Sequence, residues 1–123
     1  LLTLHQANGE AQLLAAATHL TEMAEKLFGD ENAPGFFTTQ AADAMLVRVK
    51  NGDDFSLPNA NAVMAQNYLV LGQPEKAKKI LGYFLSGSGK MWIEYTSMLT
   101  VAMQSQLFNV VCDDDGQCRI QPK

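Results

Sequence analysis

The sequence predicts an all-α fold of antiparallel helical hairpins, with small β-hairpin decorations. Two observations support this fold class. Apolar residues recur every three or four positions along most of the 123 residues, which is the spacing of one helix face. Glycine and proline separate these segments at short turns, as they do between paired antiparallel helices. A chain of this length has room for one compact unit, so we treat residues 1–123 as a single unit.

The first two helices are expected at residues 1–7 and 10–28. Asn8-Gly9 between them is typical of a helix stop followed by a turn. The second helix has the clearest apolar stripe of the chain, which predicts one buried face. The stripe consists of Leu13, Ala16, Ala17, Leu20, Met23, Ala24 and Leu27.

A short β excursion is predicted in the middle of the chain. The β-prone runs 36–39 and 45–50 could pair as a hairpin, which Asn51-Gly52 then closes. An isolated hairpin is marginally stable, so this one should lie on the helices. A polar elbow, residues 53–61, then opens into a helix over 62–71, and Pro58 stands where the first turn of a helix tolerates proline.

Two further helices and a terminal hairpin complete the predicted order. Pro74 begins a helix that pairs with the preceding one across the turn Gly72-Gln73. The apolar stripe of this helix consists of Ala77, Ile80, Leu81, Phe84 and Leu85. The last helix is expected from Trp92 to about Gln106. Residues 110–112 and 118–120 flank an Asp-Gly turn, and are expected to form a small terminal hairpin.

The composition of the chain argues against nucleic-acid and membrane partners. The net charge of −4 argues against a nucleic-acid partner, because binding phosphate requires clustered Lys and Arg. No apolar run approaches the roughly eighteen residues of a membrane span, so no membrane partner is expected. No signal peptide is visible, and the compartment stays open with the cytoplasm favoured. No cofactor is expected.

The elbow is the candidate ligand-binding corner. Asp54 and Asn61 supply acceptors and donors where a loop meets a helix N-terminus, whose N–H groups are unpaired. Basic side chains precede the elbow, and aromatic side chains could form a stacking wall for a sugar-like ligand. The predicted ligand-binding residues are Phe37, Arg48, Lys50, Asp54, Asn61 and Tyr95, with Trp92 as an alternative stacking residue. The structural alternative, which spacing alone favours, is that Asp54 and Asn61 cap the helix and hold the loop.

The two cysteines leave three interpretations open. A four-ligand zinc site would need two more Cys or His residues nearby, and the sequence has none there, so no metal site is predicted. Cys112 and Cys118 could face each other across the turn and form a disulfide. They could also be free structural thiols or serve a redox role.

Residues 65–77 are similar to one tetratricopeptide helix pair, with Tyr68, Gly72 and Ala77 at the corresponding places. A true array repeats at about 34 residues and needs several copies. Counting back that distance from Gly72 leads to Thr38, inside the β-prone run. The repeat is therefore absent, but a helical protein-interaction module or a purely structural module remains an alternative function.

Several short motifs follow one another in a recognisable order. They are Gly35-Phe36-Phe37, Leu46-Val47-Arg48-Val49-Lys50, the trio Asp54, Pro58 and Asn61, the helix segment Tyr95-Thr96-Ser97-Met98-Leu99, and Val111-Cys112 with Cys118. This succession resembles the C-terminal region of the YyaL (spermatogenesis-associated protein 20-like) family of thioredoxin-domain proteins. The resemblance covers nearly the whole chain.

The resemblance implies a thioredoxin-like domain in the parent chain, followed by an (α/α) toroid similar to those of sugar epimerases and six-hairpin glycosidases. Residues 1–123 would be the C-terminal hairpins of that toroid, with the elbow facing its central cavity. The implied partners are the rest of the parent chain and a carbohydrate-like small molecule. The thioredoxin Cys motif is absent here, so redox activity does not carry over, and the reaction and the catalytic residues stay undetermined.

The chain departs from the family pattern at three places. Asn59 stands where the family usually has Ser, and the loop at Gln73-Pro74 is shorter than usual. The family also has a further segment between the last helix and the Cys motif, where only residues 107–109 lie here. We therefore expect an odd junction, or a chain break, between Gln106 and Val110.

Overall fold

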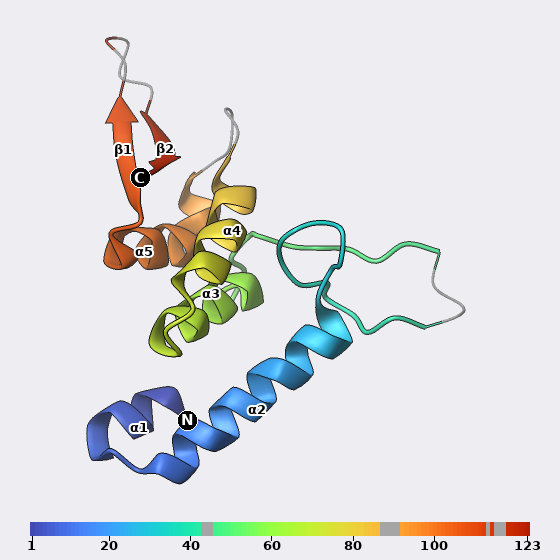
Figure 1. Ribbon diagram of the computed structural model, residues 1–123. Helices are drawn as coiled ribbons and strands as arrows, with labels where there is room; N and C mark the ends of the chain where they lie inside the picture. Colours follow the sequence, from blue (N-terminus) through green and yellow to red (C-terminus); the bar gives the residue numbers. More distant parts are fainter. Residues whose placement is uncertain (43–45, 87–91, 113, 115–117) are drawn as a thin grey trace.

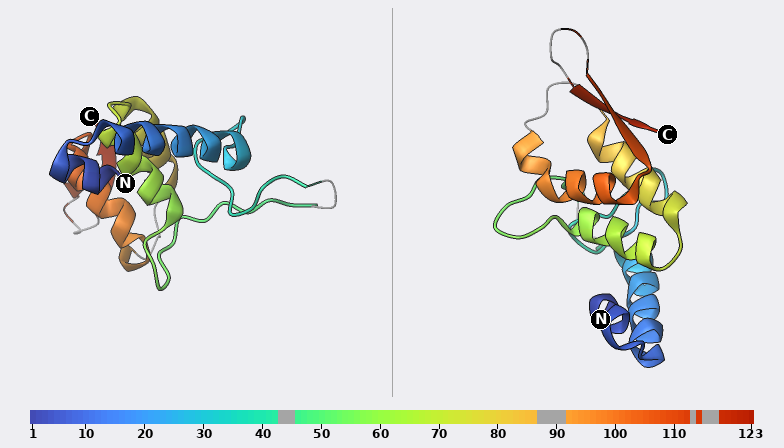
Figure 2. Two further views of the ribbon diagram at one scale, coloured as in Figure 1. Left: turned by 90° about the horizontal axis from the view of Figure 1, so that it is seen from below. Right: turned by 90° about the vertical axis from the view of Figure 1, so that its left-hand side faces the viewer.

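The computed structural model describes residues 1–42, 46–86, 92–112, 114 and 118–123 (Figure 1). The described chain is mostly helical, with one small antiparallel β-hairpin. Its elements are α1 (Leu2–Asn8), α2 (Ala11–Phe28), α3 (Ala60–Val70), α4 (Pro74–Leu85), the 3-10 helix η1 (Trp92–Tyr95), α5 (Thr96–Ser105), β1 (Phe108–Cys112) and β2 (Cys118–Pro122). Helices α3, α4 and α5 lie together between the β-hairpin at one end and the α1–α2 pair at the other (Figure 2).

The predicted helices are present with small shifts at their ends. α1 ends at Gly9, whose φ of 73° is the left-handed conformation that the predicted turn requires. α3 begins earlier than predicted, because the Asn59 side chain accepts a hydrogen bond from the Asn61 N–H and caps the helix there. α4 begins at Pro74 as predicted.

The core lies among α3, α4 and α5. The largest fully buried side chains are Tyr68, Leu81, Leu85 and Met98. Phe36, from the loop after α2, joins this core and stacks on Tyr68 with ring centroids 6.3 Å apart. The sequence stripe of α4 therefore predicted its buried face correctly.

The predicted β excursion of residues 36–50 forms only in part, because Phe37 of the first run pairs antiparallel with Lys50 of the second. Among the described residues it is reduced to isolated bridges, Gly29 to Phe36 and Phe37 to Lys50, while Met45 lies outside the described part. The side chains of Leu46, Val47 and Val49 are 99%, 73% and 59% exposed. Within the described chain these three side chains have no apolar surface to pack against, so the pairing does not extend into a ladder.

The terminal hairpin forms as predicted. β1 and β2 pair antiparallel in a register that places Phe108 opposite Pro122 and Cys112 opposite Cys118. Of the odd junction or chain break expected between Gln106 and Val110, the structure shows a junction in which α5 continues into β1. The junction is unusual in one respect: Gln106 ends α5 with a φ of 56°, a left-handed conformation rare outside glycine.

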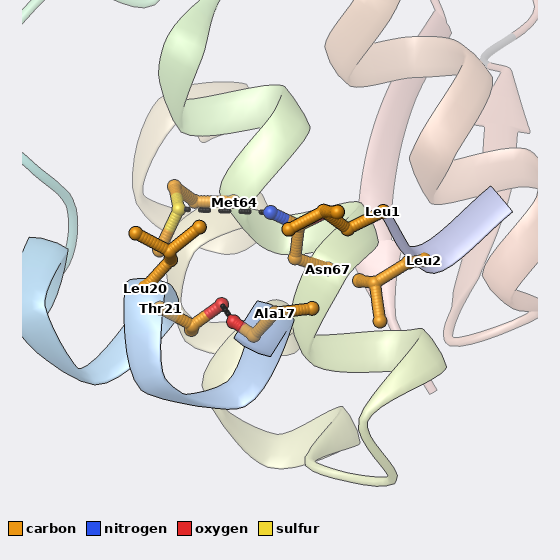
Figure 3. A pocket seen from close by; sticks show the side chains of 7 residues that line it. All are labelled: Leu1, Leu2, Ala17, Leu20, Thr21, Met64 and Asn67. Atoms are coloured by element: carbon orange, nitrogen blue, oxygen red, sulfur yellow. Dashed lines mark hydrogen bonds between the residues drawn. The ribbon is translucent and has the colours of Figure 1, made fainter. Parts of the chain in front are cut away.

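The apolar stripe of α2 is largely uncovered within the described chain. Only Ala17 and Thr21 of this helix are buried, and Leu20 and Met23 are 54% and 43% exposed. Part of the stripe faces a cavity of about 260 Å³ between α2, the start of the chain and α3 (Figure 3). Among the described helices, none is both long and apolar enough to cross a lipid bilayer.

Candidate functional site

Three polar side chains, Asp54, Asn59 and Asn61, hold the elbow together, and we call them the elbow clamp. Asn59 and Asn61 are buried, with exposed fractions of 7% and 2%. Buried amides are stable only when their donors and acceptors are paired. The clamp meets this condition by bonding to backbone groups of the loops on both sides and to the start of α5.

Asn61 joins the loop after α2 to the elbow. Its Oδ1 accepts a hydrogen bond from the Phe36 N–H at 2.6 Å, and its Nδ2 donates to the Phe36 carbonyl at 3.1 Å. The same Nδ2 donates to the Asn51 carbonyl at 2.9 Å. These bonds occupy the amide with backbone partners, so Asn61 serves the fold in this structure.

Asn59 is the true N-cap of α3. Its Oδ1 accepts from the Asn61 N–H at 2.8 Å, and its Nδ2 donates to the carbonyls of Asn51 at 3.0 Å and Asp53 at 3.1 Å. Sequence reasoning assigned the cap to Asp54 and Asn61 and missed Asn59. Asn immediately before a helix is itself a strong cap signal, and it could have identified the residue.

Asp54 caps a helix that is distant in sequence. One oxygen accepts from the Ser97 N–H at 2.6 Å, and the other accepts from the Asn59 N–H at 2.8 Å and from the Ser97 hydroxyl. Ser97 lies in the first turn of α5, and Tyr95, the N-cap residue of α5, makes no side-chain cap of its own. A carboxylate at this position also interacts favourably with the positive end of the helix dipole.

The hydrogen bonds of Asp54 outweigh its partial burial. Burial by itself would raise the pKa of the carboxyl group, but hydrogen bonds from Ser97 and Asn59 lower it, and the net pKa lies below the ordinary value. Asp54 is therefore a charged structural acceptor at neutral pH and not a general acid.

Arg48 and Lys50 bind the end of α2 and the turn that follows it. Arg48 donates to the Thr39 carbonyl at 2.8 Å and to the Leu27 carbonyl at 3.3 Å, and its guanidinium group lies 4.0 Å from the centre of the Phe37 ring. Leu27 is in the last turn of α2, where carbonyls lack partners within the helix. Arg48 thus completes that helix end, and it covers the ring that was predicted to stack on a ligand.

Lys50 holds the turn after α2. Its Nζ lies 2.6 Å from an Asp30 oxygen and donates to the carbonyls of Ala33 at 3.2 Å and Pro34 at 3.1 Å. The hydrogen bond from Lys50 lowers the pKa of the Asp30 carboxyl group, and a further bond from the Asn32 N–H adds to the effect. The ammonium group therefore has its partners within the chain.

Tyr95 lies at the junction of η1 and α5. A hydrogen bond from its hydroxyl to Asp53, together with burial, raises the pKa of Tyr95 to about 12. Gly52 is packed beside the rings of Tyr95 and Phe84, so closely that a Cβ there would lie 2.5 Å from Phe84 Cδ1. The side chain of Trp92 lies outside the described part of the chain.

The six predicted ligand residues do not line one shared cavity among those found in the described chain. Asp54 alone contributes to a groove, and none of the six lines the two other cavities. One of those is the cavity of Figure 3, and the other is a polar cavity of about 530 Å³ between α2, the following turn and α4. The ligand set therefore stays a prediction, and the observed contacts of its members are with the chain itself.

The groove beside Asp54 has a volume of about 660 Å³, and we call it the Phe55 groove. Its lining is Thr3, Asp54, Phe55, Ser56, Leu57, Pro58, Ala62, Val63, Gln66, Asn67, Thr96, Ser97, Thr100 and Val101. Phe55 and Leu57 are 81% and 78% exposed. Gln66 Oε1 is buried and has no hydrogen-bond partner. Sequence reasoning did not single out Gln66, because nothing in its local pattern marks an unpaired acceptor.

The cysteines lie at the turn end of the terminal hairpin, where Cys112 ends β1 and Cys118 begins β2. Cys112 and Cys118 are directly opposite in the strand register, and Cys112 is disulfide-bonded. The side chain of Cys118 lies outside the described part, so its pairing stays a prediction. In the part of the chain that the structure describes, no group of three or more His, Cys, Asp or Glu could hold a metal ion.

No family model and no solved structure matches this chain. Curated proteins similar to it include spermatogenesis-associated protein 20 of Rattus norvegicus, which is 36% identical over 73 residues. The Homo sapiens protein is also 36% identical over 73 residues, and the Mus musculus protein is 39% identical over 74 residues. Each match covers 58% of this chain and 9% of the relative. The chain is therefore similar, over somewhat more than half its length, to a small part of a much longer protein.

Proposed function

We propose that these residues are the C-terminal helical portion of a larger, YyaL-like thioredoxin-domain protein, in which they help to close an (α/α) toroid. In this proposal the elbow has a structural role. The observation that carries this proposal is the set of hydrogen bonds that the predicted ligand residues make. Asp54, Asn61, Arg48 and Lys50 all bond to the chain's own backbone.

Two further observations support membership in a larger protein. The curated relatives are much longer than this chain, since the match covers 9% of their length. The α1–α2 and α3–α4 pairs are helical hairpins, the building unit of such toroids, and α2 exposes Leu20 and Met23 from its apolar stripe. Apolar surface of this kind is typical of a helix that packs against another element.

Carbohydrate binding is the second candidate, and the position of Asp54 in the Phe55 groove favours it. A glycosidase needs two carboxyl groups on either side of the scissile bond. Asp54 is the single carboxylate in the lining of this groove. A hydrolytic role would therefore require a second acid from elsewhere in the parent protein.

Replacing Asp54 in the full-length parent protein separates the two candidates. The structural role predicts that Asp54→Ala lowers the melting temperature, because a lost helix cap costs about 0.5–2 kcal/mol. It also predicts no saturable heat when a panel of mono- and disaccharides is titrated by calorimetry. A saturable heat that Asp54→Ala abolishes at an unchanged melting temperature would overturn the structural proposal in favour of sugar binding.

A matched control is available on the same elements. Thr100 lines the same groove from α5, but its hydroxyl donates to the Thr96 carbonyl of its own helix at 2.8 Å. Thr100→Val keeps the shape of the side chain and should leave the melting temperature nearly unchanged. A fall as large as that of Asp54→Ala would show that any change in this region destabilises the protein, and the cap argument would be lost.

A further inference from the structure

Gln66 presents an unsatisfied acceptor inside an apolar groove. Its Oε1 is buried without a hydrogen-bond partner, and the residue lines the Phe55 groove from α3. A buried polar atom left unpaired destabilises the folded state, and native proteins retain few such atoms. The atom therefore points to a donor that is supplied from outside the described chain.

Three donors in the lining of the groove are already engaged. The Thr100 hydroxyl donates to the Thr96 carbonyl at 2.8 Å, and the Ser97 hydroxyl donates to Asp54. The side-chain amide of Asn67 is directed to the Met64 sulfur at 3.9 Å (Figure 3). Rearranging any of these groups to reach Gln66 would leave another group unpaired.

The rest of the groove is suited to an apolar occupant. Ala62 and Val101 are buried in its lining, and Phe55 and Leu57 expose their side chains at its edge. No Lys, Arg, His or Glu lines it, and both oxygens of Asp54 already accept hydrogen bonds. A charged partner would lose its hydration there without gaining a counter-charge.

We propose that the Phe55 groove receives an apolar segment from the remainder of the parent chain, and that this segment donates one hydrogen bond to Gln66 Oε1. This inference rests on the proposed function, because it requires a longer chain. An occupant in the same chain is favoured over a second copy, because the length of the curated relatives leaves most of the protein outside this region. A tethered segment also has a high effective concentration.

A free sugar matches the groove less well. A sugar presents many hydroxyl groups and needs several unpaired polar partners. Among the described residues, Gln66 Oε1 is the one buried side-chain atom of this kind. One donor on an otherwise apolar surface corresponds to the side chain of a Tyr, Trp, Ser or Thr, or to an unpaired backbone N–H in a loop.

Photo-crosslinking in the full-length parent protein tests the occupant. A benzoylphenylalanine probe replaces Leu57 at the edge of the groove, and a second variant carries the probe in place of Ile93, which is 77% exposed and lines none of the cavities described above. Mixing isotope-labelled with unlabelled protein before irradiation distinguishes bonds within one chain from bonds between copies. Mass spectrometry then identifies the linked peptides.

The proposal predicts that the Leu57 probe links, within one chain, to a peptide outside residues 1–123, and that the Ile93 probe does not link to that peptide. Links between copies would replace the proposed occupant with a second molecule of the protein. Absence of any peptide link in a folded variant, shown by an unchanged circular dichroism spectrum, would mean an open groove. Either result overturns the proposal.

A substitution at Gln66 tests the hydrogen bond. Gln66→Met keeps the length of the side chain and removes the acceptor, so the yield of the Leu57 crosslink should fall several-fold. Gln104→Met, at an exposed position of α5, is the matched control and should leave the yield unchanged. An equal yield in Gln66→Met and the control would remove the hydrogen bond from the proposal.

Different measurements would reject the proposed occupant of the Phe55 groove and the proposed structural role of the elbow. Links between copies, with Asp54→Ala still lowering the melting temperature, would reject the groove and leave the structural role of the elbow intact. A sugar heat that depends on Asp54 would reject the structural role, whatever segment the Leu57 probe identifies.

Discussion

The α3–α5 core and the α1–α2 pair have similar sequence patterns but different surroundings. In α4 the predicted stripe is buried, with Leu81 and Leu85 at 0% and 2% exposure. In α2 a stripe of equal regularity leaves Leu20 and Met23 about half exposed. An apolar stripe predicts that a helix forms and which face will be covered, but the element that covers this face has to be present.

α2 is attached to the core by the side chain of Phe28 at its end and by several polar contacts. Lys76 forms an ion pair with Glu25 at 2.6 Å, and Lys50 and Arg48 bond to the turn after α2 and to its last turn. Partly exposed ion pairs contribute roughly 0–1 kcal/mol each, whereas a fully buried leucine contributes several times as much. The core should therefore determine the stability of the chain, and α1–α2 should contribute less.

The largest effect is expected in the core. Leu81→Ala removes a fully buried side chain between α3, α4 and α5, and should lower the free energy of unfolding by about 2–5 kcal/mol. Urea denaturation monitored by circular dichroism measures this change. A loss below 1 kcal/mol would contradict the assignment of this region as the core of the chain.

The second-largest loss of stability is expected in the loop that contains Gly52, which packs against Phe84 of the core. Gly52→Ala would place a Cβ 2.5 Å from Phe84 Cδ1 and 2.9 Å from Tyr95 Cε1, and should cost about 1–3 kcal/mol through overpacking. Gly82→Ala is the matched control, because nothing lies within 4 Å of its Cβ in α4. The control should gain about 0.5–1 kcal/mol, since alanine favours a helix over glycine. Equal losses in both variants would refute the close packing of the loop.

The elbow clamp should show a smaller effect that depends on pH. Asp54→Asn weakens the cap of α5 and should cost about 0.5–2 kcal/mol at pH 7. The pKa of Asp54 is lowered in the folded state, so its stabilisation is complete above its ordinary pKa near 3.9 and disappears as the pH falls through the lowered value. The difference in stability between the unchanged protein and the Asp54→Asn variant should therefore become smaller as the pH falls. A difference that stays constant from pH 7 to pH 2 would contradict the role of the charge.

The smallest effect is expected on α2. Met23→Gln changes a residue that is 43% exposed and keeps a good helix former, so the stability of this chain should change by no more than about 0.5 kcal/mol. In the full-length parent protein the same substitution should cost more, if another element covers the stripe. Equal small effects in the two proteins would mean that the α2 face is exposed in both.

The sequence predicted the local elements well, and for identifiable reasons. Gly9 and Pro74 marked the end of α1 and the start of α4, and the β-prone runs around the Asp-Gly turn formed β1 and β2. The excursion at residues 36–50 was predicted only in part: Phe37 pairs with Lys50, but the pairing does not extend to the exposed side chains of Leu46, Val47 and Val49. β-propensity describes a fit to a half-buried sheet, and the sequence cannot say whether such a surface is available.

The candidate site was predicted in part. The elbow was correctly identified as a polar junction, and the capping alternative anticipated the kind of bonds that Asp54 and Asn61 make. Their partners were not predictable, because Asp54 caps α5 rather than the helix that follows it, and Asn61 reaches back to Phe36. Both bonds join residues far apart in the chain, and sequence spacing carries no information on such contacts.

The sequence by itself determined where helices begin and end, which face of each is apolar and which residues are suited to caps, because these properties depend on neighbours within a few positions. Only the tertiary structure decided that Asn59 caps α3, that Arg48 and Lys50 are engaged by the turn after α2, and that Gln66 is left with an unpaired oxygen. The physical reason is that a buried polar group is stabilised or destabilised by whichever atoms the fold brings within hydrogen-bonding distance, and those atoms come from anywhere in the chain.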